Sequence, residues 1–319
     1  MPRLWLGGEL VNEVHRMVER RQAVETPDIR LLGGGRGLPF EFTVFVVSDT
    51  HYGNLQNQDD APPGTPADAI ERLVVALNTL PGKPHVLGGI IERPRMVFNL
   101  GDCVHHDTDT ITRFAQDFKR NGTGDIQFPC YVMDGNHDDQ FFRDHIIATQ
   151  GSLFWGVKVG HVWFQAMRDN ITNAPTQAQI ETEVAAALSA RPAGETTVIM
   201  HHRSLDPGYS AEWDAGAKTA LETLSNSKNT LFHLHGHNHY TQHITWTGGG
   251  ASSIRMFSPG SITQSPIGGT PPYATTYPEG ILVIRFFRDR YDVADFNFGY
   301  DVLRNWAPNT WNWSETVLL

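Results

Sequence analysis

Short clusters of Asp, Asn and His residues occur along the chain, and each directly follows an apolar stretch. The clusters are Asp49-Thr50-His51, Gly101-Asp102, Gly135-Asn136-His137-Asp138, His201-His202 and Gly236-His237-Asn238-His239. Carboxylate and amide oxygens together with imidazole nitrogens form a mixed ligand set that suits Zn, Mn or Fe and is poor for Ca. The clusters hold enough such groups for two metal ions.

A pair of metal ions would supply a specific chemistry. Two ions about 3.5–4 Å apart can activate water at neutral pH and can hold the attacking and leaving oxygens of a displacement at phosphorus. Ions this close need a shared carboxylate. Asp102 is the candidate, because the glycine before it lets the backbone pass near the site. The clusters therefore indicate hydrolysis of a phosphoester.

Each cluster must be positioned by the segment before it, and these segments are predicted to be β-strands. The segments are FTVFVVS, RMVFNL, PCYVM, TTVIM and NTLFHL. Ligands at the carboxyl ends of such strands converge on one rim of a sheet. Helical spacing of apolar residues predicts helices at about 66–80, 109–119, 138–149, 176–190 and 212–225. Residues 153–167 are predicted to form a hairpin.

The C-terminal third continues with strands. ITWT, ASSIRMFS, GILVIRFF and YDVADFNF are expected to form a second sheet. The fold class is thus α/β, a two-sheet β-sandwich flanked by helices. Residues 1–40 are expected to be an N-terminal appendage, 41–300 the catalytic domain and 301–319 a C-terminal arm.

The composition of the chain argues against some classes of binding partner. The net charge of -10 argues against nucleic acid as a bulk partner, because a phosphate backbone is bound mainly by Lys and Arg. No segment approaches the run of about 20 apolar residues that spans a membrane. The N-terminal segment lacks the apolar region of a signal peptide, so a cytoplasmic location is expected. The sequence does not decide between monomer and dimer.

The order D-x-H, GD, GNHD, a lone His and GHxH resembles the calcineurin-like metallophosphoesterase superfamily over about residues 42–262. The resemblance implies that superfamily's four-layer architecture and two divalent or mixed-valence transition metal ions, which are Mn, Zn or Fe. It also implies a ligand set with Asp49, His51 and His239 on one ion, Asn136, His201 and His237 on the other, and Asp102 across both.

The resemblance further implies a role for the GNHD segment in the reaction. His137 would lie beside the scissile phosphate, where it would stabilise charge or protonate the leaving oxygen. Asp138 would orient the His137 ring.

Two segments differ from the pattern of many relatives. After the GD pair the chain reads GDCVHHD, which puts His105 where purple acid phosphatases carry an iron-ligating tyrosine. His105 is therefore a candidate for a further imidazole ligand, for a histidine that supports a ligand, or for one that faces solvent. The lone His motif continues as His201-His202-Arg203-Ser204 rather than HHPP. His201 is the preferred ligand because it directly follows its strand, and His202 is the alternative. Arg203 could reach a substrate phosphate or form a salt bridge at the rim.

These observations predict a dinuclear metallophosphoesterase that hydrolyses a small-molecule phosphodiester. The diester preference rests on the GNHD and GHNH motifs, which are similar to the phosphodiesterase branches, and on the few cations near the motifs to bind a doubly charged monoester. The alternatives are a phosphomonoesterase of the same fold, a nuclease, and a binding module that kept the metal site and lost catalysis. A nuclease would need a basic groove for its strand.

Overall fold

The structure is a computed structural model. It describes residues 40–53, 69–104, 108–168, 176–189, 196–205, 213, 215–227, 229–239, 241–246, 253–261, 279–299 and 308–319. Apart from Phe40, the predicted N-terminal appendage lies outside the described residues.

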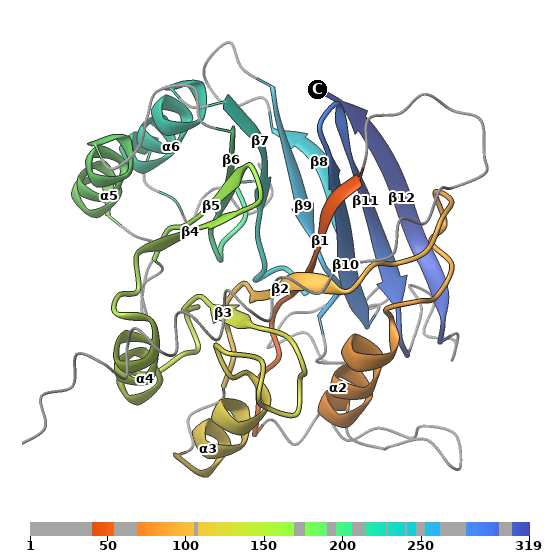
Figure 1. The fold of residues 1–319 in the computed structure, drawn as a ribbon. Coiled ribbons are helices and arrows are strands. Elements are labelled where there is room, and N and C mark those ends of the chain that lie inside the picture. The colour runs from red at the N-terminus through yellow and green to blue at the C-terminus, as the bar shows by residue number, and fades with distance from the viewer. Residues whose placement is uncertain are drawn as a thin grey trace, which may run out of the picture. The chain divides into compact units, whose positions relative to one another are not determined.

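Two six-stranded sheets form the centre of the described chain (Figure 1). The first sheet has the order β12 (Thr310–Leu318), β11 (Arg290–Asn297), β10 (Gly280–Phe287), β1 (Phe40–Val47), β2 (Pro94–Asn99) and β3 (Cys130–Val132). The second sheet has the order β4 (Trp155–Val159), β5 (Val162–Ala166), β6 (Thr196–Met200), β7 (Asn229–Leu234), β9 (Ile254–Ser258) and β8 (Gln242–Trp246).

Alternation along the strands explains how the sheets pack. In β1, Val44 and Val46 belong to a buried cluster shared with Phe164 and Phe232 of the other sheet, whereas Phe45 belongs to a cluster with the helices. Successive side chains of a strand point to opposite faces, so both faces of β1 are covered. The main core therefore lies between the two sheets.

Helices cover the two outer faces. The first sheet is covered by α2 (Ala69–Thr79), α3 (Thr108–Asp117) and α4 (Gln140–Gln150), and the second by α5 (Gln177–Ser189) and α6 (Ala215–Ser227) (Figure 1). The Asp139 side chain caps the N-terminus of α4 by accepting a hydrogen bond from the Phe142 amide. The result is four layers, which confirms the predicted fold class.

One part of the predicted topology is wrong. The strands after residue 241 do not form one sheet of their own: β8 and β9 complete the second sheet, whereas β10 and β11 join the first. All eight residues of β10 are buried, which suits a strand that pairs with β1 on one side and β11 on the other. The predicted C-terminal arm contributes β12, the edge strand of the first sheet.

Among the described residues, none of the helices is both long and apolar enough to cross a lipid bilayer.

Candidate metal centre and active site

The predicted ligand clusters follow parallel strands of both sheets. The strands β1, β2 and β3 are parallel in the first sheet, and β6 and β7 are parallel in the second. Backbone bonds tie neighbouring segments together, since the Asp49 amide donates to the Gly101 carbonyl at 3.0 Å and the Gly236 amide donates to the His202 carbonyl at 2.8 Å. The clusters thus lie at the carboxyl ends of strands from two sheets, not of one.

A first group of buried ligand-type atoms comes from Asp49, His51, Asp102 and His239, and these atoms all lie within 4.8 Å of one another. The Nε2 atoms of His51 and His239 are 3.3 Å apart, and His239 Nε2 is 3.4 Å from an Asp49 oxygen. The Asp49 carboxylate also accepts hydrogen bonds from the His237 amide at 3.0 and 3.1 Å. The β1 segment and the last His motif therefore meet in one cluster.

A second group is formed by Asp102, His202 and His237 and shares the Asp102 side chain with the first. His202 Nε2 lies 3.1 Å from Asp102 Oδ2 and 3.2 Å from Asn136 Oδ1. The other ring nitrogen, Nδ1, donates to the Leu100 carbonyl at 2.8 Å. Because a carbonyl can only accept, Nδ1 carries a proton, and Nε2 is the ring atom that faces Asp102.

The donor chemistry of these groups fits a cation. His202 Nε2 lies within hydrogen-bond distance of both Asp102 Oδ2 and Asn136 Oδ1, and the Asp102 side chain is fully buried. Burial opposes ionisation of Asp102, but the imidazoles of His202 and His51 outweigh it and hold the pKa of Asp102 well below its usual value. A buried carboxylate surrounded by imidazole nitrogens is the arrangement that a transition metal ion stabilises.

Backbone strain is concentrated at the same residues. A positive φ occurs at five residues of the two groups, Asp49 (52°), His51 (40°), Asp102 (50°), His237 (68°) and His239 (60°). Residues with a side chain rarely adopt this left-handed region, and such strain gathers at functional sites. The strained backbone is thus an independent indication that these side chains are held for a function.

Gly101 shows why the motif needs a glycine before Asp102. Its φ is 102°, and a Cβ atom would lie 2.7 Å from both the Asp134 carbonyl oxygen and His202 Nδ1. Only a residue without a side chain allows this approach of the two sheets.

The GNHD segment lies beside the clusters. His137 is half-buried, its amide donates to Asp102 Oδ1 at 2.7 Å, and its ring centre is 5.2 Å from that of His51. Asp138 is fully buried, and its carboxylate accepts hydrogen bonds from the amides of Cys103 (2.8 Å), Val104 (3.0 Å) and Gly135 (2.8 Å). Asp138 therefore links the segments that follow β2 and β3, a role that the sequence does not indicate.

His201, the ligand preferred from the sequence, lies elsewhere. Its Nδ1 donates to the Arg203 carbonyl at 2.7 Å, and its Nε2 is 3.1 Å from His233 Nδ1. His233 Nε2 in turn lies 2.8 Å from the Ser225 hydroxyl, which donates to the Leu221 carbonyl. Burial, together with His235, lowers the pKa of His233 to about 3. The structure brings His202 to the metal cluster and places His201 in a chain of neutral hydrogen bonds under α6.

Alternation along β6 explains this placement. Met200 packs between the sheets, whereas Ile199 packs against α5 and α6. His201 continues the pairing of the strand through its amide, which donates to the Leu234 carbonyl. His201 therefore follows Ile199 to the helix side, where its ring contacts Trp213, and His202 turns to the side of the site.

The remaining candidates are placed as follows. Arg203 is buried at the carboxyl end of β6 next to His202. His105 lies outside the described residues. Arg143 of α4, which the sequence analysis did not select, is buried and contacts Asp134, Gly135 and Asp138 of the GNHD region. No sequence signal singles it out, because one Arg in an amphipathic helix usually faces solvent.

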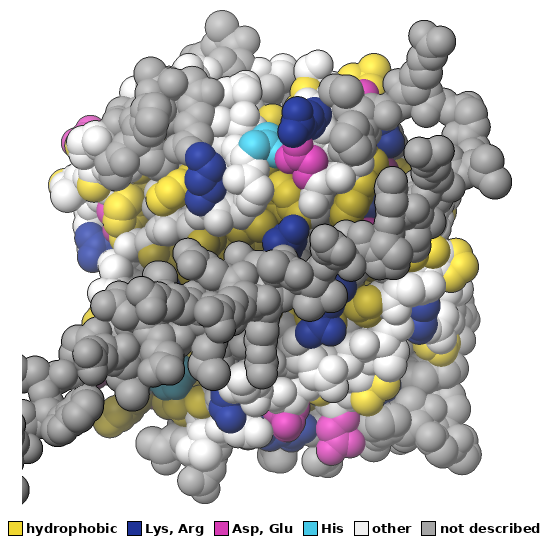
Figure 2. Space-filling model, in the orientation of Figure 1, with side chains coloured by type: hydrophobic (Ala, Val, Ile, Leu, Met, Phe, Trp, Pro, Cys, Tyr) yellow, Lys and Arg dark blue, Asp and Glu magenta, His cyan; other side chains and the backbone are white. Residues whose placement is uncertain are grey.

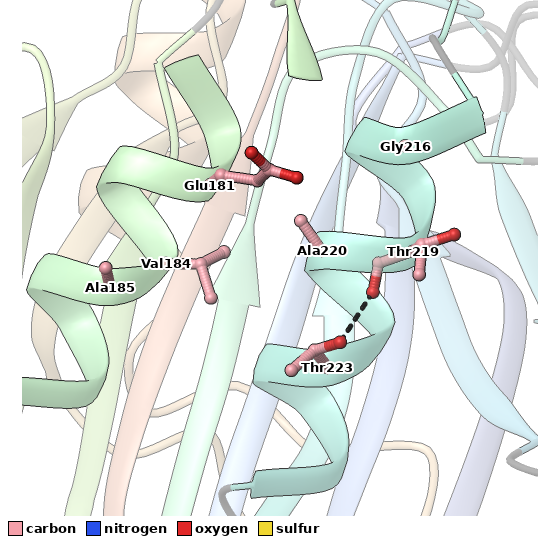
Figure 3. Close-up of a pocket in the computed structure, with 7 residues that line it drawn as sticks. All are labelled: Glu181, Val184, Ala185, Gly216, Thr219, Ala220 and Thr223. Carbon is pink, nitrogen blue, oxygen red and sulfur yellow. Dashed lines mark hydrogen bonds between the residues drawn. The ribbon is translucent and has the colours of Figure 1, made fainter. Parts of the chain in front are cut away.

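A separate cavity of about 400 Å³ lies between α5 and α6 (Figure 3). Small and apolar side chains such as Val184, Ala185 and Ala220 line it, and Glu181 lies at one end. None of the ligand-type residues of the two groups lines this cavity.

The charged surface is mixed. On the face shown in Figure 2, the described Lys and Arg side chains are scattered among acidic and uncharged groups instead of forming one patch. This face offers no basic track for a nucleic acid strand among its described residues.

Comparison with known proteins agrees with the motifs. A family model described as calcineurin-like phosphoesterase matches residues 42–241. No curated protein matches the chain.

Solved structures with TM-scores above 0.5 share the fold at low sequence identity. GAP50 of Plasmodium, described as the anchor in the inner membrane complex, is 9% identical over 88% of this chain and 90% of its own, with a TM-score of 0.55. PhoD is 10% identical over 90% of this chain and 73% of its own, with a TM-score of 0.53. A predicted phosphoesterase of Streptococcus pneumoniae is 14% identical over 87% of this chain and 98% of its own, with a TM-score of 0.40.

Proposed function

Since the chain belongs to the calcineurin-like phosphoesterase family, we propose that it is a two-metal phosphodiesterase that hydrolyses a small-molecule phosphodiester. The observation that carries the proposal is the pair of ligand-type groups that share the Asp102 carboxylate. A shared carboxylate is what holds two ions close enough to act on one phosphoryl group.

The proposed ligands follow from the geometry of the two groups. One ion would be held by Asp49, His51, Asp102 and His239, and the other by Asp102, Asn136, His202 and His237. His202 thus takes the place that the sequence analysis gave to His201. When bound, such ions lower the pKa of water and neutralise charge on phosphoryl oxygens. The mixed oxygen and nitrogen donors suit Mn, Zn or Fe.

His137 is the proposed acid of the reaction. It is half-buried beside the clusters and can be reached by substrate, whereas its amide is fixed on Asp102. From this place the ring would donate a proton to the departing oxygen or stabilise its charge. Asp138 would support this step by fixing the segment that carries His137, through its three backbone contacts.

Charge supports the preference for a diester. A monoester carries up to two negative charges at neutral pH and a diester carries one. Near the clusters, the Arg143 guanidinium is paired with Asp134 at 2.9 Å, so its charge is already balanced. A singly charged phosphodiester matches this balance better.

The test combines metal content with initial rates. Protein loaded separately with Mn, Zn and Fe would be assayed on bis(p-nitrophenyl) phosphate, p-nitrophenyl phosphate and single-stranded DNA. We expect two ions per chain and fastest cleavage of the diester. Faster monoester cleavage would establish a phosphomonoesterase, and faster DNA cleavage a nuclease. Two ions with no turnover on any of the three would make the chain a binding module.

A further inference from the structure

A buried guanidinium lies directly behind the GNHD segment. Arg143 of α4 is 7% exposed, and its Nη1 forms an ion pair with Asp134 Oδ2 at 2.9 Å. Its Nε donates to the Asp138 carbonyl at 3.1 Å, and its Nη2 donates to the Gly135 carbonyl, also at 3.1 Å. All three contacts fall within the five residues 134–138.

These contacts bracket the two residues that face the site. Gly135 and Asp138 directly flank Asn136 and His137 in the chain. The planar fork of Arg143 therefore fixes the backbone on both sides of them at once. The N-cap residue of α4, Asp139, comes directly after Asp138 in the chain. Arg143 lies in the first turns of this helix, so the helix holds the guanidinium in place.

We propose that Arg143 is a positioning residue for His137, an inference that rests on the proposed function. Metal ions would hold Asn136 directly, whereas His137 is not among their proposed ligands. The His137 backbone is fixed by the Asp102 contact on one side and by Arg143 on the other. Loss of the fork should therefore impair proton donation more than metal binding.

Arg143→Lys is the primary variant. It keeps a positive charge beside the buried Asp134 carboxylate but cannot form the three-pronged contact, because an ammonium is a single point donor. Arg143→Ala removes both the charge and the contacts, so it is used only for rescue. Arg120→Lys is the matched control, since Arg120 is exposed and contacts the other end of α4 through the Thr149 carbonyl at 3.0 Å.

Steady-state kinetics distinguish a loss of His137 positioning from a general loss of structure. With the same metal content as wild type, Arg143→Lys should lower kcat by about 100-fold, as a misplacement of about 1 Å does, and leave KM nearly unchanged. The loss should be larger for an alkyl phosphodiester than for bis(p-nitrophenyl) phosphate, because a poor leaving group needs the proton more. Added guanidinium should restore part of kcat in Arg143→Ala, and Arg120→Lys should behave as wild type.

A second readout does not depend on activity. Deuterium exchange of metal-loaded protein should become faster in the peptide covering 134–139 in Arg143→Lys, with no change in Arg120→Lys. Equal losses of kcat with both leaving groups, a parallel loss of metal, or unchanged exchange would each overturn the proposal. If wild-type protein cleaves no phosphoester, the proposed function fails, and the exchange experiment still decides whether Arg143 fixes the segment.

Discussion

Replacing His201 and His202 separately by Ala tests the placement of the two adjacent imidazoles. The structure puts His202 Nε2 at 3.1 Å from Asp102 and puts His201 on Arg203 and His233. The two variants should therefore have opposite consequences. His202→Ala should lose metal, whereas His201→Ala should lose stability and keep both ions.

The sizes of the stability effects follow from the hydrogen bonds that each change removes. His201→Ala removes two buried hydrogen bonds, one to the Arg203 carbonyl and one to His233 Nδ1, at about 0.5–1.5 kcal/mol each, so the free energy of unfolding should fall by about 1–3 kcal/mol. His202→Ala removes the hydrogen bond to the Leu100 carbonyl, at about 0.5–1.5 kcal/mol, together with the Nε2 atom that lies 3.1 Å from Asp102.

Urea unfolding of the metal-free variants and metal analysis of the loaded ones would measure both effects. His243→Ala is the control, because His243 is exposed on β8, stacks on Trp313 and belongs to neither ligand group. A His201 variant that loses an ion while the His202 variant keeps two would refute the placement of these rings.

Three further predictions concern the shared carboxylate, the acid and a buried Asp. Asp102→Ala should abolish turnover and lower the content of both ions together, because Asp102 belongs to both ligand groups; metal analysis would show it. His137→Ala should keep both ions and lower kcat by about 10²–10⁴-fold in steady-state assays, and a wild-type rate would contradict its role as the acid. Burial raises the pKa of Asp295 to about 6, although Thr241 and Asn312 donate to it. The folded state thus binds this proton more tightly than the unfolded chain, so stability should fall as pH rises from about 4 through about 6. Asp295→Asn should remove that fall, which is on the order of 3 kcal/mol, in urea unfolding across this pH range.

The sequence predicts most of the elements because their signals are local. The strand before each cluster and the helices α2 to α6 lie close to the expected positions, since apolar periodicity and the polar segments between them mark each one. The assignment of strands to sheets is not local. The segment GILVIRFF could form a strand of either sheet. Its pairing with β1, more than two hundred residues away, determines that it joins the first sheet.

The site was predictable at the level of motifs but not of neighbouring side chains. TTVIM is apolar throughout, so it does not reveal that Met200 faces the other sheet and Ile199 faces the helices. Without that information, His201 and His202 cannot be told apart by alternation. Arg143 was missed for a similar reason, since its partners are two backbone carbonyls and a carboxylate that the sequence does not place.

The left-handed backbone at the proposed ligands has a consequence for engineering. Each such residue carries a conformational cost of about 1–3 kcal/mol, and glycine at Asp49 or His237 would relieve its steric part. Libraries selected only for heat resistance should therefore accumulate substitutions at these positions and lose the ligands with them. Thermostable variants of this chain that still turn over substrate should instead gain their stability in the core between the sheets and on the outer helices.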